Sequence, residues 1–246
     1  IAYGMPDVLG RQRDRYSGKT VLVVGAGHSA VGSLVALARL AEEEGATRVH
    51  WALRGSTPSR AFGGGEADQL PARGELGIRL RQLIEAGRLQ VHSNFRIREL
   101  RQSGTALRVI PEESIGSRTP LHGVDEIICA TGSRPNLEMV RELRVRTDVL
   151  LESAEELAPL IDPNLHSCGT VRPHGHRELA HPEPGFYIAG AKSYGRAPTF
   201  LMATGYEQVR SIVAALAGDM SAADDVQLEL PETGVCVTDG TDGGNA

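Results

Sequence analysis

The chain has 246 residues, of which 41% are hydrophobic and 23% are charged. These proportions are those of a globular protein, and they exclude a disordered, collagen-like or coiled-coil chain. The formal net charge of −5 argues against nucleic-acid binding through bulk positive charge. The three cysteines lie far apart with no Cys-x-x-Cys pair, so we expect no disulfide scaffold and no cysteine-based metal site. No apolar run is long enough to span a membrane and no signal peptide is visible, so we expect a cytoplasmic protein without membrane contact.

The first part of the chain has the pattern of a strand–helix–strand unit. Residues 1–17 are polar and basic, and we expect a lead-in loop there. The apolar run at 20–24 predicts a buried strand, and the helical periodicity of residues 29–43 predicts an amphipathic helix. Residues 48–53 predict the next strand, which completes a βαβ unit.

The later elements are predicted in the same way from periodicity and turn residues. Residues 55–73 are expected to form a long loop, and residues 163–184 an irregular segment. The expected helices are 76–87, 150–162 and 203–216, and the expected strands are 89–92, 95–100, 106–110, 124–130 and 185–189. The acidic tail at 219–246 is expected to be partly flexible.

A glycine-rich turn lies between the first predicted strand and helix. Its sequence from Gly25 to Ala30 has the form G-x-G-x-x-A. Gly25 would permit the tight turn, Gly27 would let the backbone approach a pyrophosphate, and Ala30 would permit close packing of helix on strand. The helix N-terminus would add N–H donors and partial positive charge, so His28 and Ser29 belong to the same predicted site. The alternatives are a plain tight turn without ligand and, for His28, a helix-capping or solvated role.

The end of the second strand indicates which dinucleotide would bind. An NAD site usually has Asp or Glu there to hold the ribose 2′-hydroxyl, but this chain has Arg54, with Arg60 six residues later. An arginine can pair with a 2′-phosphate through two N–H groups. The sequence therefore favours NADP over NAD, unless both arginines are ordinary solvated loop charges.

Two later segments complete a pattern that resembles a known family. They are ICATGSRPN at 128–136 and GFYIAGA at 185–191, which precedes the helix at 203–216. Together with the glycine-rich turn, they resemble the two-dinucleotide-binding-domain flavoproteins. These include the pyridine nucleotide-disulfide oxidoreductases, the thioredoxin-reductase-like enzymes and the flavin-containing monooxygenases. The resemblance covers residues 18–217.

This resemblance implies an α/β fold and two cofactors, FAD and NADP. Residues 18–126 would form a Rossmann-like, three-layer NADP-binding domain, and residues 127–218 the C-terminal part of an FAD-binding domain. Ala130, Thr131 and Gly132 would lie at the crossover between the two domains. Gly190 and Ala191 would bring the backbone close to the ribityl and phosphate groups of the flavin. NADPH would reduce the flavin for a small-molecule substrate, and the sequence nominates no catalytic acid or base.

The chain also departs from the family pattern. The second G-x-G-x-x-G, which binds the FAD pyrophosphate, should precede the NADP domain, but only 24 residues precede Gly25. We therefore expect a segment of a flavoprotein, lacking the N-terminal FAD-binding half. The alternatives are a split-flavoprotein subunit with a partner chain, and an NADP-binding module without activity of its own. Exposed apolar faces on residues 124–130 and 203–216 would indicate a partner, and a homodimer is also compatible with the sequence.

The type of chemistry follows from the missing dithiol. Without Cys-x-x-Cys, monooxygenase-type or other non-dithiol flavin chemistry is favoured, and a thioredoxin-reductase-like enzyme without that motif is the alternative. Ala191 and Lys192 stand where the family often has Asp, and Lys192 would contact phosphate or be solvated. The segment with His166, Cys168, His174 and His176 lacks the spacing of a metal site, so we expect a substrate-pocket lining or a plain loop there.

Overall fold

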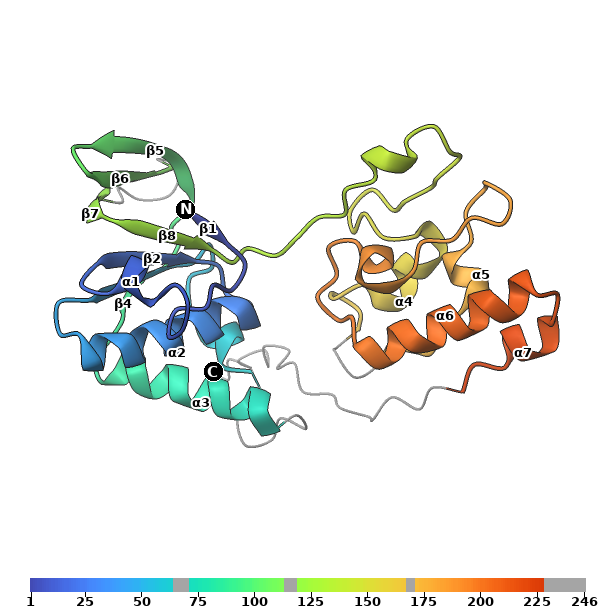
Figure 1. Ribbon diagram of the computed structural model, residues 1–246, viewed down its shortest axis with the longest axis horizontal. Coiled ribbons are helices and arrows are strands. Elements are labelled where there is room, and N and C mark those ends of the chain that lie inside the picture. Colours follow the sequence, from blue (N-terminus) through green and yellow to red (C-terminus); the bar gives the residue numbers. More distant parts are fainter. Residues whose placement is uncertain (64–70, 113–118, 167–170, 228–246) are drawn as a thin grey trace, which may run out of the picture. The chain divides into compact units, whose positions relative to one another are not determined.

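The computed structural model describes residues 1–63, 71–112, 119–166 and 171–227 (Figure 1). Its chain divides into two compact units, of which the first comprises residues 1–132 and the second begins at Ser133. The division falls after Gly132 and not after residue 126, because the strand at 126–129 pairs within the sheet of the first unit.

A parallel sheet forms the centre of the first unit. Its described strands are β1 (Ala2–Tyr3), β8 (Glu126–Cys129), β2 (Thr20–Val24), β3 (Arg48–Ala52) and β4 (Gln90–His92), in that spatial order. Val24 at the end of β2 lies level with Ala52 of β3 and with Cys129 of β8. The segments that follow these three strands therefore leave the sheet at one edge.

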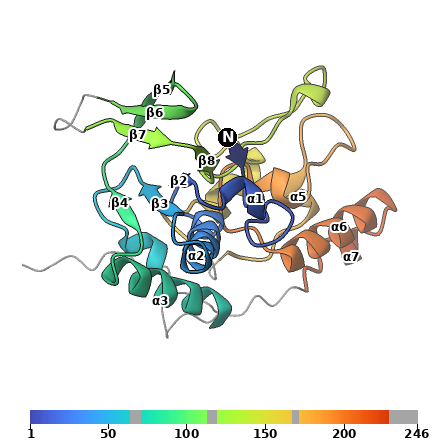
Figure 2. The ribbon, with the colours of Figure 1, turned by 60° about the vertical axis from the view of Figure 1, so that its left-hand side comes forward.

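The two faces of this sheet are covered differently (Figure 2). Helices α2 (His28–Glu43) and α3 (Pro71–Glu85) cover one face, with the short 3₁₀-helix η1 (Ser59–Phe62) beside α3. An antiparallel sheet of β5 (Ile97–Ser103), β6 (Ala106–Pro111) and β7 (Leu121–Val124) covers the other. The alternation of β2 shows both contacts, since Val21 and Val23 pack towards α2 while Leu22 packs with Phe95 and Val109. The predicted three-layer α/β fold is confirmed.

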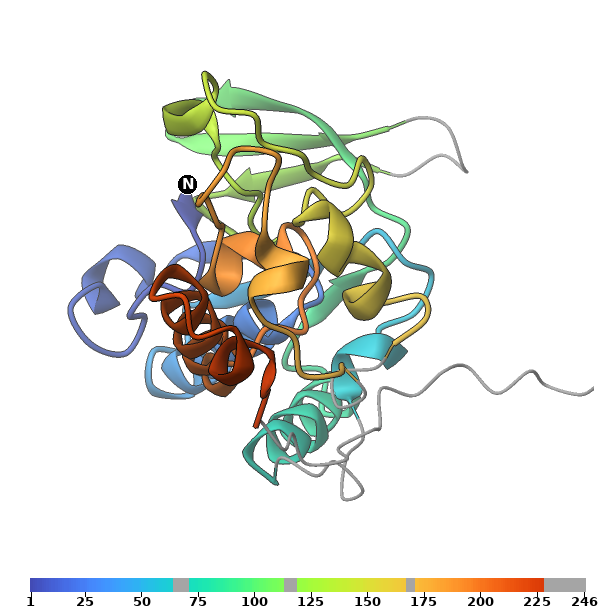
Figure 3. The ribbon, with the colours of Figure 1, turned by 90° about the vertical axis from the view of Figure 1, so that its right-hand side faces the viewer.

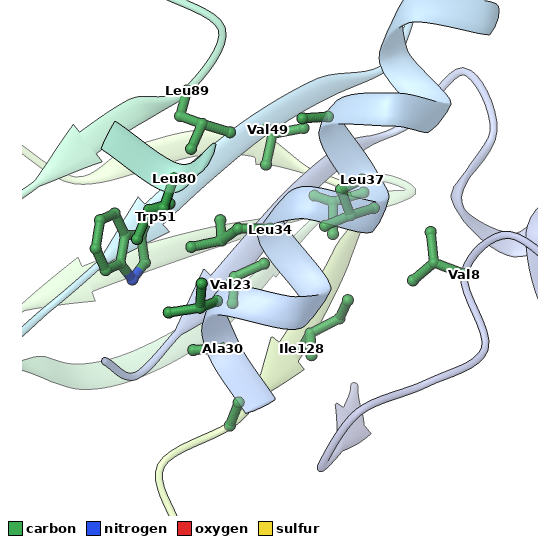
Figure 4. Packing of buried hydrophobic residues seen from close by; sticks show 14 of the residues in the cluster. Val8, Val23, Ala30, Leu34, Leu37, Val49, Trp51, Leu80, Leu89 and Ile128 are labelled. Atoms are coloured by element: carbon green, nitrogen blue, oxygen red, sulfur yellow. The ribbon is translucent and has the colours of Figure 1, made fainter. Parts of the chain in front are cut away.

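The core between sheet and helices is built from the predicted helical stripe (Figure 4). Leu34 and Leu37 of α2 pack against Val23 and Trp51, and all four are fully buried. The predicted strand 20–24 and helix 29–43 match β2 and α2. The predicted and observed elements agree because the apolar residues repeat regularly in these segments, and the same residues form the core.

Two expectations for the first unit were wrong. The lead-in is not a loop, because β1 pairs with β8 and the helix α1 (Arg13–Tyr16) follows, with Val8 and Tyr16 buried in the core. The strand expected at 124–130 is divided into β7 and β8 at Asp125. This residue bonds Thr20 through both its backbone N–H and its carboxylate, which holds β8 beside β2. Val124, Ile127 and Ile128 are buried, so this segment presents no exposed apolar face.

The second unit is built from short helices and one long helix, α6 (Met202–Leu216), which has the dark red-orange colour in Figure 3. Its other described helices are η3 (Glu138–Val140), η4 (Glu155–Leu157), α4 (Ala158–Ile161), α5 (His176–Leu179), η5 (Gly190–Tyr194) and α7 (Met220–Asp224). Leu157, Ile161, Leu179 and Tyr194 form the centre of its core. The helix expected at 203–216 is confirmed.

Two other elements expected in this unit were wrong. Helix 150–162 is reduced to η4 and α4, because Pro159 occupies the start of a helix and Glu152 has a positive φ of 58°. Residues 185–189 form no strand. Tyr187 makes only an isolated bridge to Ala180, and a strand needs a hydrogen-bonded neighbour that the described residues do not supply. In the described part of the chain, no helix is long and apolar enough to cross a membrane.

Candidate functional site

The glycine-rich turn begins with a residue that the backbone requires to be glycine. Gly25 has a φ of 126°, and a Cβ there would collide with the Ala130 carbonyl. Its N–H donates to the Ala52 carbonyl at 3.1 Å, and its carbonyl accepts from the Trp51 indole Nε1 at 2.6 Å. The turn is therefore clamped between the ends of β3 and β8.

Gly27, by contrast, has no internal reason to be glycine. Its φ is −85°, which any residue adopts, and an added Cβ would meet no described atom within 4 Å. Gly27 is also the N-cap of α2, where no side chain makes a capping hydrogen bond and no acid lies in the first turn. Backbone N–H groups at such a terminus attract anions. The open space above Gly27 is what the close approach of a ligand phosphate requires.

The other residues of the turn are divided between surface and core. His28 and Ser29 are exposed in the first turn of α2, and Ala30 is fully buried against the sheet. Ala30 thus has the packing role that the motif predicts, while the two exposed residues lie beside Gly27 at the helix N-terminus.

Arg54 lies two residues after the end of β3, at the same edge of the sheet. It is exposed and makes no ion pair with any residue that the structure describes. Arg60 lies in η1, but its side chain is not among those that the structure describes. The close packing of η1 on α3 fixes its backbone, because a Cβ on Gly77 would collide with the Phe62 carbonyl.

The third predicted group, residues 130–132, also lies at this edge. The N–H of Ala130 donates to the Val24 carbonyl at 2.8 Å, and Thr131 and Gly132 are exposed beyond it. Gly132 has a φ of 87° and open space where a Cβ would lie. The structure thus brings the glycine-rich turn, Arg54 and residues 130–132 to one edge of the first unit.

Gly190 and Ala191 lie in the second unit, at the start of η5. Gly190 has a φ of 72° with open space at its Cβ position, and Ala191 is exposed. The Nζ of Lys192 donates to the Asn136 carbonyl at 3.1 Å. The Gly190 N–H is already bonded, since it donates to the Gln208 side-chain oxygen at 2.7 Å.

A buried polar network holds this turn in place. The Gln208 amide nitrogen donates to Ser193 Oγ at 3.1 Å and to His174 Nε2 at 2.9 Å, and Ser193 Oγ donates to the Gly190 carbonyl at 2.7 Å. His174 Nδ1 lies 2.9 Å from the Arg172 carbonyl, so the neutral Nδ1–H tautomer satisfies both ring nitrogens. Burial lowers the pKa of His174, which favours this neutral form.

Sequence reasoning missed two of these positioning residues. Trp51 was assigned only to a strand, and Gln208 only to a helix. A buried indole needs a hydrogen-bond acceptor, and a buried amide side chain needs hydrogen-bond partners. The local sequence pattern identifies neither the burial nor the partners.

The segment with His166, Cys168, His174 and His176 does not converge on one point. Cys168 lies outside the described residues, and His166 Nε2 lies 2.9 Å from the Pro159 carbonyl. His174 belongs to the network above, whereas His176 Nε2 bonds Asp224 at 2.9 Å. Among the described residues, no group of three potential ligands is placed to hold a metal ion.

Comparison with known proteins identifies the fold. No family model and no curated protein matches the sequence. Among solved structures, bacillithiol disulfide reductase Bdr (YpdA) from Bacillus cereus matches with a TM-score of 0.54 and 15% identity, covering 89% of this chain and 55% of that one. Bdr (YpdA) from Staphylococcus aureus matches with a TM-score of 0.57 and 14% identity, covering 83% of this chain and 52% of that one. DfoA, a cadaverine monooxygenase from Erwinia amylovora solved with bound FAD, matches with a TM-score of 0.54 and 11% identity. This match covers 91% of this chain and 57% of DfoA.

These likenesses extend over both units, but the chain spans only about half the length of each of these proteins. At these low sequence identities, the matches establish the fold of this chain but not its substrate. The chain therefore has the fold of two-dinucleotide-binding-domain flavoprotein oxidoreductases, over about half of their length.

Proposed function

We propose that the first unit binds NADPH across the edge where β2, β3 and β8 end. The observation that carries this proposal is Gly27, where neither backbone conformation nor packing requires glycine and where α2 presents an uncapped N-terminus. A pyrophosphate at this position would receive backbone N–H donors and the favourable end of the helix dipole. Ligands of open parallel sheets bind at this carboxyl edge.

Arg54 supports NADP over NAD in this proposal. Its exposed guanidinium follows the strand next to β2 and is free of any described ion pair. The sequence from Leu53 to Arg60 contains no carboxylate that would repel a 2′-phosphate. Arg54 would therefore pair with the 2′-phosphate, and Arg60 in η1 would be the second candidate.

The larger proposal is that the chain is a segment of an FAD-dependent oxidoreductase in which NADPH reduces the flavin. The fold likeness supports it, as do Gly190 and Ala191, where the turn leaves open space beside exposed backbone. Such a cofactor pair supplies hydride transfer from nicotinamide to flavin. This chain's residues would bind and orient the cofactors, and no side chain is proposed as an acid, base or nucleophile.

Non-dithiol chemistry of the monooxygenase type is the favoured version of this function. The sequence holds no Cys-x-x-Cys pair, and one of the matching structures is a monooxygenase. A thioredoxin-reductase-like enzyme without that motif is the alternative among enzymes. An NADP-binding module or split-flavoprotein subunit without activity of its own is favoured by a different observation, since residues 185–189 join no sheet within the part of the chain that the structure describes.

Two titrations test the proposal. The first compares NADPH with NADH binding to the purified chain by calorimetry, and tighter NADPH binding supports the site while no binding of either refutes it. The second records the flavin absorption spectrum with the chain, before and after anaerobic NADPH. A perturbed band that bleaches supports the two-cofactor function in this chain. A free-flavin spectrum with intact NADPH binding supports the binding module.

A further inference from the structure

The buried polar network at the Gly190 turn is a chain of hydrogen bonds with one direction. The Gly190 N–H needs an acceptor, which places Gln208 Oε1 against it at 2.7 Å. The two hydrogens of Gln208 Nε2 are then directed to Ser193 Oγ and to His174 Nε2. Ser193 in turn donates to the Gly190 carbonyl. Side chains therefore hold both backbone groups of Gly190, and the Gln208 amide satisfies all its partners in one orientation only.

This orientation requires one state of the His174 imidazole. Its Nε2 must be an unprotonated acceptor, and its Nδ1, 2.9 Å from the Arg172 carbonyl, must carry the hydrogen. The residues His174, Ser193 and Gln208 are each no more than 2% exposed, so their bonds are shielded from bulk water. The network is therefore complete while His174 is neutral.

A proton on His174 conflicts with that arrangement. The protonated Nε2 becomes a donor and faces another donor, the Nε2 of Gln208. Turning the Gln208 amide over would present its oxygen to the imidazolium, but it would also place an NH₂ group against the Gly190 N–H. Either orientation leaves a donor without its acceptor inside the network, which is costly. The two states of one imidazole thus correspond to a held and a released Gly190 turn.

The groups that face His174 favour its neutral form. Burial lowers the pKa of His174, and the Glu178 carboxylate of α5 opposes that shift without cancelling it. Tyr194 of η5, whose ring centroid lies 5.5 Å from that of His174, keeps its proton because burial raises its pKa. From α6 the facing group is the uncharged Gln208 amide. The charged groups of α5, α6, α7 and η5 that bond other partners are His176, Arg177, Lys192, Glu207, Arg210 and Asp224.

We propose that His174 and Gln208 are positioning residues, which hold the Gly190 turn while His174 is neutral and release it when His174 gains a proton. The consequence for the flavin rests on the proposed function, in which this turn contacts the ribityl and phosphate groups. Acidification would then weaken FAD binding at least about fivefold. By linkage, bound FAD would lower the midpoint of the His174 titration by the same factor, or about 0.7 pH units.

Nitrogen NMR tests the resting state of the network. In a chain labelled with ¹⁵N-histidine at pH 8, His174 should be the neutral Nδ1–H tautomer, because its Nε2 accepts from Gln208. The signals of His174 are identified by their absence in His174→Gln. An Nε2–H tautomer at His174 would overturn the proposal, since that ring cannot accept the Gln208 hydrogen bond.

An acid titration of the same chain tests the coupling. Labelling with ¹³C′-alanine and ¹⁵N-glycine selects the four Ala-Gly pairs, which contain Gly27, Gly87, Gly190 and Gly218. The Gly190 amide signal should shift with the midpoint of the His174 ring. His174→Gln should abolish this shift and leave the pH response of the other three signals unchanged. The matched control is His181→Gln, a half-buried histidine of the same unit outside the network, which should keep the shift.

Two results of this titration would overturn the proposal. One is a Gly190 signal that does not follow His174. The other is unfolding of the chain before either signal moves, because His174 would then stay neutral throughout the folded state.

FAD titration above and below the His174 midpoint tests the consequence for the flavin. The wild-type chain and His181→Gln should bind FAD at least about fivefold more weakly at the lower pH, and His174→Gln should lose this difference. FAD affinity that is independent of His174, while Gly190 still follows it, would overturn the flavin part of the inference. No FAD binding at either pH would instead refute the flavin role of this chain, and the NMR titration decides the coupling without FAD.

Discussion

The two glycines of the turn should respond in opposite ways to the same substitution. In Gly25→Ala the new methyl group collides with the Ala130 carbonyl at a residue whose φ is 126°, so both strain and overlap oppose folding. We expect a loss of about 2–5 kcal/mol in the free energy of unfolding. In Gly27→Ala the methyl group meets no described atom at a φ of −85°, so the stability should change by less than about 1 kcal/mol.

Ligand binding should be affected where stability is not, namely in Gly27→Ala. The methyl group of Gly27→Ala occupies the space proposed for the NADPH pyrophosphate, so affinity should fall at least tenfold, or about 1.4 kcal/mol. Thermal denaturation measures the first effect, and calorimetric titration of the folded variant with NADPH measures the second. A Gly27→Ala chain that keeps its stability and binds NADPH like wild type would refute the assignment of this turn to a phosphate.

Three further predictions follow from the same contacts. Arg54→Ala should weaken NADPH binding by roughly 1.5–3 kcal/mol and leave NADH binding unchanged. The control is Arg88→Ala, which should alter neither, because Arg88 precedes the N-terminal end of β4 at the opposite edge of the sheet. Trp51→Phe removes the hydrogen bond to the Gly25 carbonyl, and denaturant titration should show a loss of about 1–3 kcal/mol. Because burial lowers the pKa of His174, the unfolded chain takes up a proton below about pH 6.5 that the folded chain excludes, and stability should fall as the pH decreases. His174→Gln should reduce that slope by up to about 1.4 kcal/mol per pH unit, although His50, His92 and His181, whose pKa values burial also lowers, keep part of it.

The first unit could be largely predicted from the sequence because its signals are local. A buried parallel strand has a continuous apolar run, and the helix after it repeats its apolar residues on one face, so 20–24 and 29–43 could be placed directly. The carboxyl ends of parallel strands share one edge, so the turn at Gly25 and the arginine after the next strand could be expected near one another. The elements β1 and α1 and the division of 124–130 into β7 and β8 escaped, because elements of two to four residues have no periodicity to detect.

The second unit could not be predicted to the same extent, because its structure depends on contacts distant in sequence. The apolar run at 185–189 has strand composition, but the described residues offer Tyr187 only a bridge to Ala180. Short helices such as α4 and α5 hold four residues each, which is too few for a periodic pattern. The buried network of Gln208 joins residues 15 and 34 positions away, and no local pattern records such a link.

Helix α6 shows why amphipathicity alone does not tell which face is buried. Its valines Val209 and Val213 are exposed, whereas Gln208 and Ser211 are buried beside Ile212. Its period predicts a helix with one apolar stripe, and the usual inference would place that stripe in the core of its own unit. The polar residues at 204, 208 and 211 decide otherwise, because Gln208 and Ser211 have partners on η5, α5 and α7 that no solvent-facing arrangement would retain. The exposed stripe therefore contributes little to the hydrophobic stabilisation of the unit itself. For this reason Val209→Glu should leave the free energy of unfolding nearly unchanged in a denaturant titration, and a loss of folding in that variant would show that the stripe belongs to the core after all.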